Sequence, residues 1–129
     1  MPQLSLHSPI GDLSIAEDDG AIVSLDWGWA RDQQPTPLLE RAKAELEAYF
    51  DGRRRTFDLP LAPSGTAFQH SVWRAMQAIP SGATRTYGQL AAELHSAARA
   101  VGMACGANPI PVIIPCHRAV GGTGALTGY

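Results

Sequence analysis

The sequence predicts an α/β (α+β) protein with two lobes, an antiparallel sheet with one helix followed by a helical lobe. Two observations lead to this fold class. Short segments of alternating apolar and polar residues, separated by turn residues, fill the first part of the chain, as in paired strands. Apolar residues at helical spacing, in runs opened by capping patterns, follow the stretch 60–65. We therefore place the lobes at residues 1–62 and 63–129.

A meander of three antiparallel strands is expected to open the chain. Pro9-Ile10-Gly11 and Asp18-Asp19-Gly20 have the composition of tight turns, and each lies between two alternating segments. The expected strands cover residues 4–6, 13–15 and 22–25.

One helix and a fourth strand are expected to complete the first lobe. Thr36 can cap a helix that starts at Pro37 and runs to about Phe50, because proline is favoured in the first helical turn. Three arginines, residues 53–55, then lead into an expected strand at 56–59. Such a basic triplet is more typical of solvated charge at a strand edge than of nucleic-acid binding.

The second lobe is expected to contain three helices. Thr66 with Gln69, and Thr86 with Gln89, have the spacing of capping boxes, so helices are expected to follow each pair. A further helix is expected from about Ala97 to Cys105, close behind the second. Two short helices with a tight junction suggest a helix-turn-helix, although the pattern alone is common among helical pairs.

The last third ends in irregular structure. Pro111 and Pro115 exclude a helix over 110–115 and favour an extended apolar segment. The glycine-rich stretch 121–129 is expected to form a hairpin or lid.

Charge and cysteine content narrow the function classes. The net charge is −2, but residues 1–63 carry eleven acids against six bases, whereas residues 64–129 carry four arginines against one glutamate. A sparsely basic second lobe fits a small DNA footprint. Two cysteines and four scattered histidines lack the spacing of a zinc site, so no metal or cofactor is expected.

The sequence shows neither a membrane span nor a signal peptide, and this bears on where the protein is expected to be located. No apolar run approaches the roughly 20 residues of a membrane span, and Met1 to Ile10 do not resemble a signal peptide. We expect a cytoplasmic monomer without membrane contact, in which reducing conditions keep both cysteines as free thiols.

Cys116 is the candidate nucleophile. A cysteine attacks as its thiolate, and a neighbouring base or cation helps it to ionise. His117 and Arg118 follow it directly, but adjacent side chains on a strand point to opposite faces, so His117 meets Cys116 only where the backbone turns. Pro115 favours such a turn. From spacing alone, a structural cysteine remains the commoner interpretation.

Three sequence motifs resemble the O6-alkylguanine-DNA alkyltransferase family. They are Pro115-Cys116-His117-Arg118, Asn108-Pro109-Ile110-Pro111 and Ala98-Arg99-Ala100-Val101-Gly102, and the likeness extends over nearly the whole chain. The resemblance implies an N-terminal lobe like ribonuclease H and a C-terminal winged-helix-like lobe. It also implies repair of double-stranded DNA containing O6-alkylguanine, by irreversible, single-turnover alkyl transfer to a cysteine without a cofactor.

The resemblance also implies a role for individual residues. Cys116 is the acceptor, His117 draws off its proton through a water, Tyr87 protonates the leaving purine and aids rotation of its phosphate, and Asn108 ties the recognition helix to the acceptor segment. Arg99 enters the base stack as the nucleotide rotates out. Ala98 and Arg118 are further DNA contacts, and the alkyl pocket is formed by Val112, Ile113, Ile114, Pro115 and Tyr129.

This sequence departs from the family's pattern in two places. Between Tyr87 and Arg99 it is about two residues shorter, so Leu94-His95-Ser96 must form a tighter turn. Family members also continue beyond the tyrosine matching Tyr129, with a serine that bonds the purine and a helix whose glutamate orients the histidine. Two expectations stay open, a longer natural protein or a variant with weakened activity.

Three other functions compete with alkyl transfer. A non-catalytic sensor of alkylated DNA is the first alternative, but such proteins replace the acceptor cysteine, which this chain retains as Cys116. A thiol hydrolase using Cys116 and His117 predicts turnover without DNA. A winged-helix regulator predicts DNA binding with an incidental cysteine.

Overall fold

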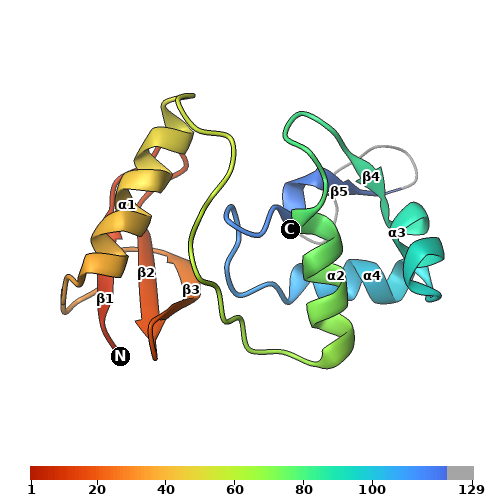
Figure 1. Ribbon diagram of the computed structural model, residues 1–129, viewed down its shortest axis with the longest axis horizontal. Coiled ribbons are helices and arrows are strands. Elements are labelled where there is room, and N and C mark those ends of the chain that lie inside the picture. Colours follow the sequence, from red (N-terminus) through yellow and green to blue (C-terminus); the bar gives the residue numbers. More distant parts are fainter. Residues whose placement is uncertain (122–129) are drawn as a thin grey trace. The chain divides into compact units, whose positions relative to one another are not determined.

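The computed structural model describes residues 1–121, and the chain divides into two compact units, residues 1–64 and residues 65 onward (Figure 1). The first unit contains β1 (Gln3–Leu6), β2 (Leu13–Asp18), β3 (Ala21–Trp27) and α1 (Pro37–Phe50). The strands pair in the antiparallel order β1-β2-β3, which confirms the expected meander.

The core of the first unit lies between the sheet and α1, which packs on β1 and β2. Thr36 caps the helix through its hydroxyl, which accepts the N–H of Leu39 at 3.1 Å, as the sequence predicted. Alternate strand residues and one face of the helix are buried: Leu4, Leu6, Leu13, Ile15, Ile22, Leu25, Leu39, Ala42 and Leu46. Burial of this apolar surface is the main stabilising contribution to the unit.

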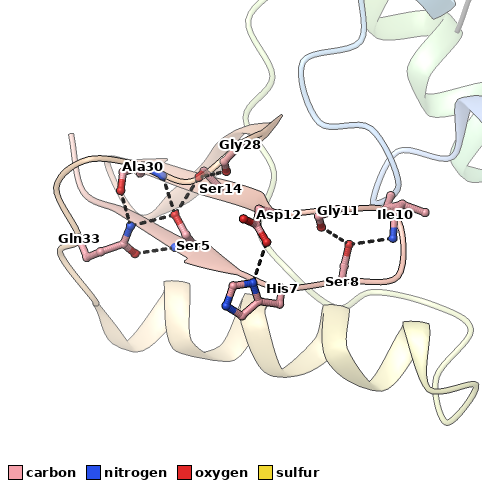
Figure 2. Close-up of polar contacts among 10 residues, drawn as sticks. All are labelled: Ser5, His7, Ser8, Ile10, Gly11, Asp12, Ser14, Gly28, Ala30 and Gln33. Atoms are coloured by element: carbon pink, nitrogen blue, oxygen red, sulfur yellow. Dashed lines mark hydrogen bonds and ion pairs between the residues drawn. The ribbon is translucent and has the colours of Figure 1, made fainter.

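Ser5 is a buried polar residue whose hydrogen bonds hold the loop after β3 against β1 (Figure 2). Its backbone N–H donates to Gln33 Oε1 at 2.7 Å, and its hydroxyl oxygen accepts from the Ala30 N–H and from Gln33 Nε2, both at 2.9 Å. The hydroxyl also contacts Ser14 Oγ of β2 at 2.8 Å. Ser5 is therefore satisfied in the core, so its burial carries little penalty.

The prediction of a strand at 56–59 was wrong, because this segment makes a hydrogen bond to α1 and does not pair with the sheet. The buried carboxylate of Glu45 accepts the Asp58 N–H at 2.9 Å and pairs with Arg54 at 3.1 Å. The chain reaches the sheet only afterwards, where Ile22 donates its N–H to the Pro60 carbonyl and accepts that of Ala62, both at 2.8 Å.

The second unit is built on three helices, α2 (Ala67–Gln77), α3 (Tyr87–Leu94) and α4 (Ala98–Gly106). Both expected capping boxes are present, Thr66 with Gln69 and Thr86 with Gln89. A two-residue strand, β4 (Arg85–Thr86), pairs in parallel with β5 (Ala119–Val120). This arrangement confirms a helical second lobe that contains a helix pair.

The turn between α3 and α4 is as tight as the shortened sequence requires. His95 ends α3 in the left-handed conformation, with φ +54°, and the Ser96 N–H donates to the Ala91 carbonyl at 2.8 Å. This C-cap ends α3, α4 begins at Ala98, and α3 packs on α4. Only residues 95–97 therefore separate the two helices.

Trp73 of α2 fixes the C-terminal end of α4. Its side chain is 1% exposed, and its indole N–H donates to the Ala104 carbonyl at 2.8 Å. Ala104 belongs to the last turn of α4, and its carbonyl also accepts the N–H of the C-cap residue Ala107 at 3.2 Å. The indole therefore provides both core volume and a hydrogen bond at the helix end.

We predict that Trp73→Phe lowers the free energy of unfolding by about 1–3 kcal/mol, because it removes a buried hydrogen bond and leaves a small cavity. Urea unfolding followed by far-ultraviolet circular dichroism measures the change. Trp27→Phe is the matched control, because Trp27 is 53% exposed, and it should change stability by less than about 0.5 kcal/mol. Equal losses in the two variants would contradict the role given to the indole N–H.

Candidate active site

The segment expected to be extended at 110–115 instead folds into a tight turn. The Ile114 N–H donates to the Ile110 carbonyl at 2.9 Å, Pro111 bridges Ile114, and Val112 has φ +74°. The prediction of extended backbone was wrong, although the exclusion of a helix held. The physical reason lies in Asn108, whose side chain bonds both ends of the turn.

The side-chain amide of Asn108 makes three hydrogen bonds. Its Oδ1 accepts the Ile110 N–H at 2.9 Å, while its Nδ2 donates to the Ile114 carbonyl and to Cys116 Sγ, each at 2.9 Å. Asn108 follows α4 directly, so one side chain joins the end of this helix, the 110–114 turn and the candidate nucleophile.

Cys116 begins a single turn of 3₁₀ helix, η1 (Cys116–Arg118). The Arg118 N–H donates to the Pro115 carbonyl at 3.0 Å, so the backbone turns at the cysteine as the sequence suggested for Pro115. Cys116 is buried, with 5% exposure, and it is a free thiol.

A second thiol, that of Cys105 in the last turn of α4, lies beside Cys116. Cys116 Sγ donates to the Cys105 carbonyl oxygen at 3.1 Å, which holds the two cysteines side by side. The hydrogen bond with the Cys105 thiol lowers the pKa of Cys116 below its ordinary 9.0; burial opposes this effect, and the Asn108 amide adds to it. The same contact and burial raise the pKa of Cys105, so Cys116 is the thiol that ionises.

His117 and Arg118 complete η1 and are both half-buried. Burial, followed by the charge of Arg118, lowers the pKa of the His117 imidazole below 6.5, so the ring is neutral at physiological pH. The Arg118 guanidinium donates to the Ile79 carbonyl at 2.8 Å, just beyond the C-terminal end of α2. Within residues 1–121, no hydrogen bond joins the His117 ring to Cys116 Sγ.

Two of the residues expected to contact DNA, Ala98 and Arg99, lie at the other end of α4. Ala98 and Arg99 are exposed in its first turn, about six residues and roughly 9 Å of helical rise before Cys105. Tyr87 begins α3, is 8% exposed and lies against Gly102, where a Cβ atom would come 3.4 Å from the ring. Helix α4 therefore connects an exposed, cationic end to the buried thiols.

The expected pocket residues follow the turn. The structure describes four of them, and all four are buried: Val112, Ile113, Ile114 and Pro115. The fifth, Tyr129, lies outside the described residues. Sequence reasoning missed two features. The sequence patterns give no role to Cys105, which is buried, or to Met103, which is 70% exposed one turn after Arg99. The spacing of Val101, Ala104 and Cys105 predicts the buried face, but not the contact with Cys116.

The site has the chemistry of a thiol nucleophile. Among residues 1–121, no three His, Cys, Asp or Glu side chains gather to hold a metal ion, and no helix is long and apolar enough to span a membrane. The Asn108 amide donates to the sulfur of Cys116, and the neutral imidazole of His117 belongs to the next residue in the chain. Such an arrangement supports attack by sulfur on an electrophilic carbon.

Comparisons with known proteins cover both units. Residues 4–63 match the ribonuclease-like domain of 6-O-methylguanine DNA methyltransferase, and residues 67–129 match the DNA binding domain of the same protein family. A methylated-DNA–protein-cysteine methyltransferase of Methanosarcina mazei is 56% identical over 96% of this chain and 85% of its own length. The constitutive enzyme of that name from Bacillus subtilis is 44% identical over 95% and 82%.

A solved structure is similar throughout. The crystal structure of Mycobacterium tuberculosis OGT in complex with DNA superposes with a TM-score of 0.88 at 40% identity, covering 100% of this chain and 84% of that one. Each unit of the present fold therefore has a counterpart in a protein that was solved with DNA.

We predict that Asn108→Ala raises the pKa of Cys116, because the thiolate loses a hydrogen-bond donor. Asn108→Asp should raise it at least as much, since a carboxylate cannot donate and adds negative charge. Titration of thiolate ultraviolet absorbance measures both shifts, and Cys116→Ala identifies the signal. An unchanged or lower pKa in both variants would contradict the role of the amide.

Proposed function

This chain belongs to the 6-O-methylguanine DNA methyltransferase family, so it repairs DNA by alkyl transfer to one of its own cysteines, and we propose that Cys116 is the acceptor. The observation that supports this choice is the hydrogen bond from Asn108 Nδ2 to Cys116 Sγ, which favours the thiolate. The higher pKa of Cys105 makes the second cysteine the poorer nucleophile.

The proposed reaction is a single displacement. The Cys116 thiolate attacks the alkyl carbon, a carbon–sulfur bond forms, and the bond between that carbon and O6 of guanine breaks. The resulting thioether is stable, and no residue is proposed to regenerate the thiol. Each molecule therefore acts once, and no cofactor enters the reaction.

Two proton transfers accompany the displacement. The neutral His117 ring is the proposed acceptor of the Cys116 proton, through a water molecule. Tyr87 is the proposed donor to the leaving purine, which would otherwise depart as a costly anion.

The target base must leave the duplex, because its O6 substituent is inaccessible to a buried thiol while the base is stacked. We assign Arg99, exposed in the first turn of α4, to the space that the flipped nucleotide leaves, with Ala98 beside it. Arg118 is assigned chiefly to holding η1 on the end of α2, because its guanidinium already bonds the Ile79 carbonyl. Its contact with DNA is a secondary expectation.

The alkyl pocket is proposed to use the 110–114 turn. The apolar side chains of Val112, Ile113 and Ile114, with Pro115, would form walls around the alkyl group, and Tyr129 would join them. A cytoplasmic location is also part of this proposal, because an acceptor thiol needs a reducing compartment.

We predict that incubation with an oligonucleotide duplex containing O6-methylguanine adds one methyl group, about 14 Da, to the intact protein. Cys116→Ala should abolish the gain, whereas Cys105→Ala should retain it, since Cys105 is not the acceptor.

The same experiment distinguishes the other functions. DNA binding without a mass gain would favour a sensor, and repeated turnover of an amide or ester without DNA would favour a thiol hydrolase. Mass gain in Cys116→Ala would disprove the assignment of the acceptor.

We predict that Arg99→Ala slows transfer from duplex DNA at least about tenfold more than transfer from free O6-benzylguanine, because a free base needs no flipping. Single-turnover kinetics with both substrates measure the ratio. Arg74→Ala is a matched control, since it removes an exposed helical arginine outside the helix pair. Equal slowing on both substrates would remove Arg99 from the flipping step.

A further inference from the structure

Cys105 is a buried thiol that the transfer reaction does not consume. It lies in the last turn of α4 with 3% exposure, and its Sγ is 3.3 Å from Sδ of Met76, which is fully buried in α2. Its backbone carbonyl oxygen accepts from Cys116 Sγ of η1 at 3.1 Å. Cys105 thus lies between a sulfur of α2 and the acceptor segment in the core of the second unit.

The backbone holds the two cysteines together. Cys116 Sγ is 3.1 Å from the carbonyl oxygen of Cys105 itself, and Asn108 fixes the connection between them at both ends of the 110–114 turn. Both sulfurs are free thiols. Two cysteines held this close, with the sulfur of one against the backbone of the other, can form a disulfide after a local movement of the side chains.

We propose that Cys105 and Cys116 are a redox modification site, in which hydrogen peroxide joins them in an intramolecular disulfide that reversibly masks the acceptor. Formation of this bond is independent of the proposed function, and only its consequence for repair rests on Cys116 being the acceptor.

The proposed chemistry has two balanced steps. The Cys116 thiolate attacks hydrogen peroxide, the O–O bond breaks, and sulfenic acid and hydroxide form. Cys105 Sγ then attacks the Cys116 sulfur, the S–S bond forms, and hydroxide leaves, taking up the Cys105 proton as water. Overall, two thiols are oxidised by two electrons, and one peroxide is reduced to two molecules of water.

The surroundings of each cysteine indicate which thiol attacks the peroxide and which one then forms the disulfide. Cys116 Sγ accepts from the Asn108 amide, and the pKa of this thiol is lowered, so Cys116 carries the thiolate and reacts first. Cys105 stays protonated and is the resolving thiol. Its sulfur must leave Met76 and approach Cys116 to about 2.05 Å, so the bond is expected to be strained and easily reduced by thiols.

The sequence makes the test simple. No lysine or arginine lies between the two cysteines, so trypsin releases both in one peptide, residues 100–118. The free chain is treated with graded hydrogen peroxide, quenched with catalase, blocked with iodoacetamide and digested without reductant. We expect residues 100–118 to lose about 2 Da and to take up no blocking group, and dithiothreitol to reverse both effects.

Two variants control the assignment. In Cys105→Ser and Cys105→Ala the loss of 2 Da should disappear, and Cys116 should instead gain about 32 Da as sulfinic acid, which dithiothreitol does not reverse. In the unmutated chain, transfer from free O6-benzylguanine should fall in proportion to the disulfide and return on reduction. Each variant is compared with its own untreated sample.

The outcomes separate the two proposals. Sulfinic acid on Cys116 of the unmutated chain, without the peptide that has lost 2 Da, overturns the disulfide. A covalent dimer that forms in its place also overturns it. Absence of methyl transfer by untreated protein overturns the proposed function and leaves the disulfide measurement intact. A disulfide that leaves transfer undiminished overturns the masking.

Discussion

The side-chain amide of Asn108 is the interaction on which the rest of the site depends. Its three hydrogen bonds close the 110–114 turn and reach Cys116 Sγ. Without them, a segment containing two prolines has few backbone hydrogen bonds to define its shape. The same amide also favours the charged form of the sulfur, so a single group determines both the position and the reactivity of the nucleophile.

Helix α4 connects the proposed DNA contact at Arg99 to the proposed acceptor, Cys116. Its first turn exposes Arg99, and its last turn supplies the Cys105 carbonyl oxygen that accepts from Cys116 Sγ. Trp73 secures that last turn from α2, and Arg118 secures η1 at the end of the same helix. A displacement of α4 on DNA would therefore be transmitted to the acceptor within one rigid cluster of hydrogen bonds.

Local signals predicted much of the fold, and tertiary contacts decided the rest. The capping boxes at Thr66 and Thr86 depend on residues three positions apart, so the sequence located those helices. The strand predicted at 56–59 does not form, because the buried carboxylate of Glu45 accepts the backbone N–H of Asp58 in that segment. The contact between Cys105 and Cys116 was not predictable, because eleven positions of irregular chain separate residues that only the Asn108 turn brings together.

The central claim is that this fold directs the alkyl group to Cys116 and not to the neighbouring thiol. The most direct measurement uses duplex DNA with isotopically labelled O6-methylguanine, followed by fragmentation of residues 100–118 in a tandem mass spectrometer. The account predicts the whole label on Cys116 and an unmodified Cys105. Label on Cys105, or divided between the two sulfurs, would contradict it.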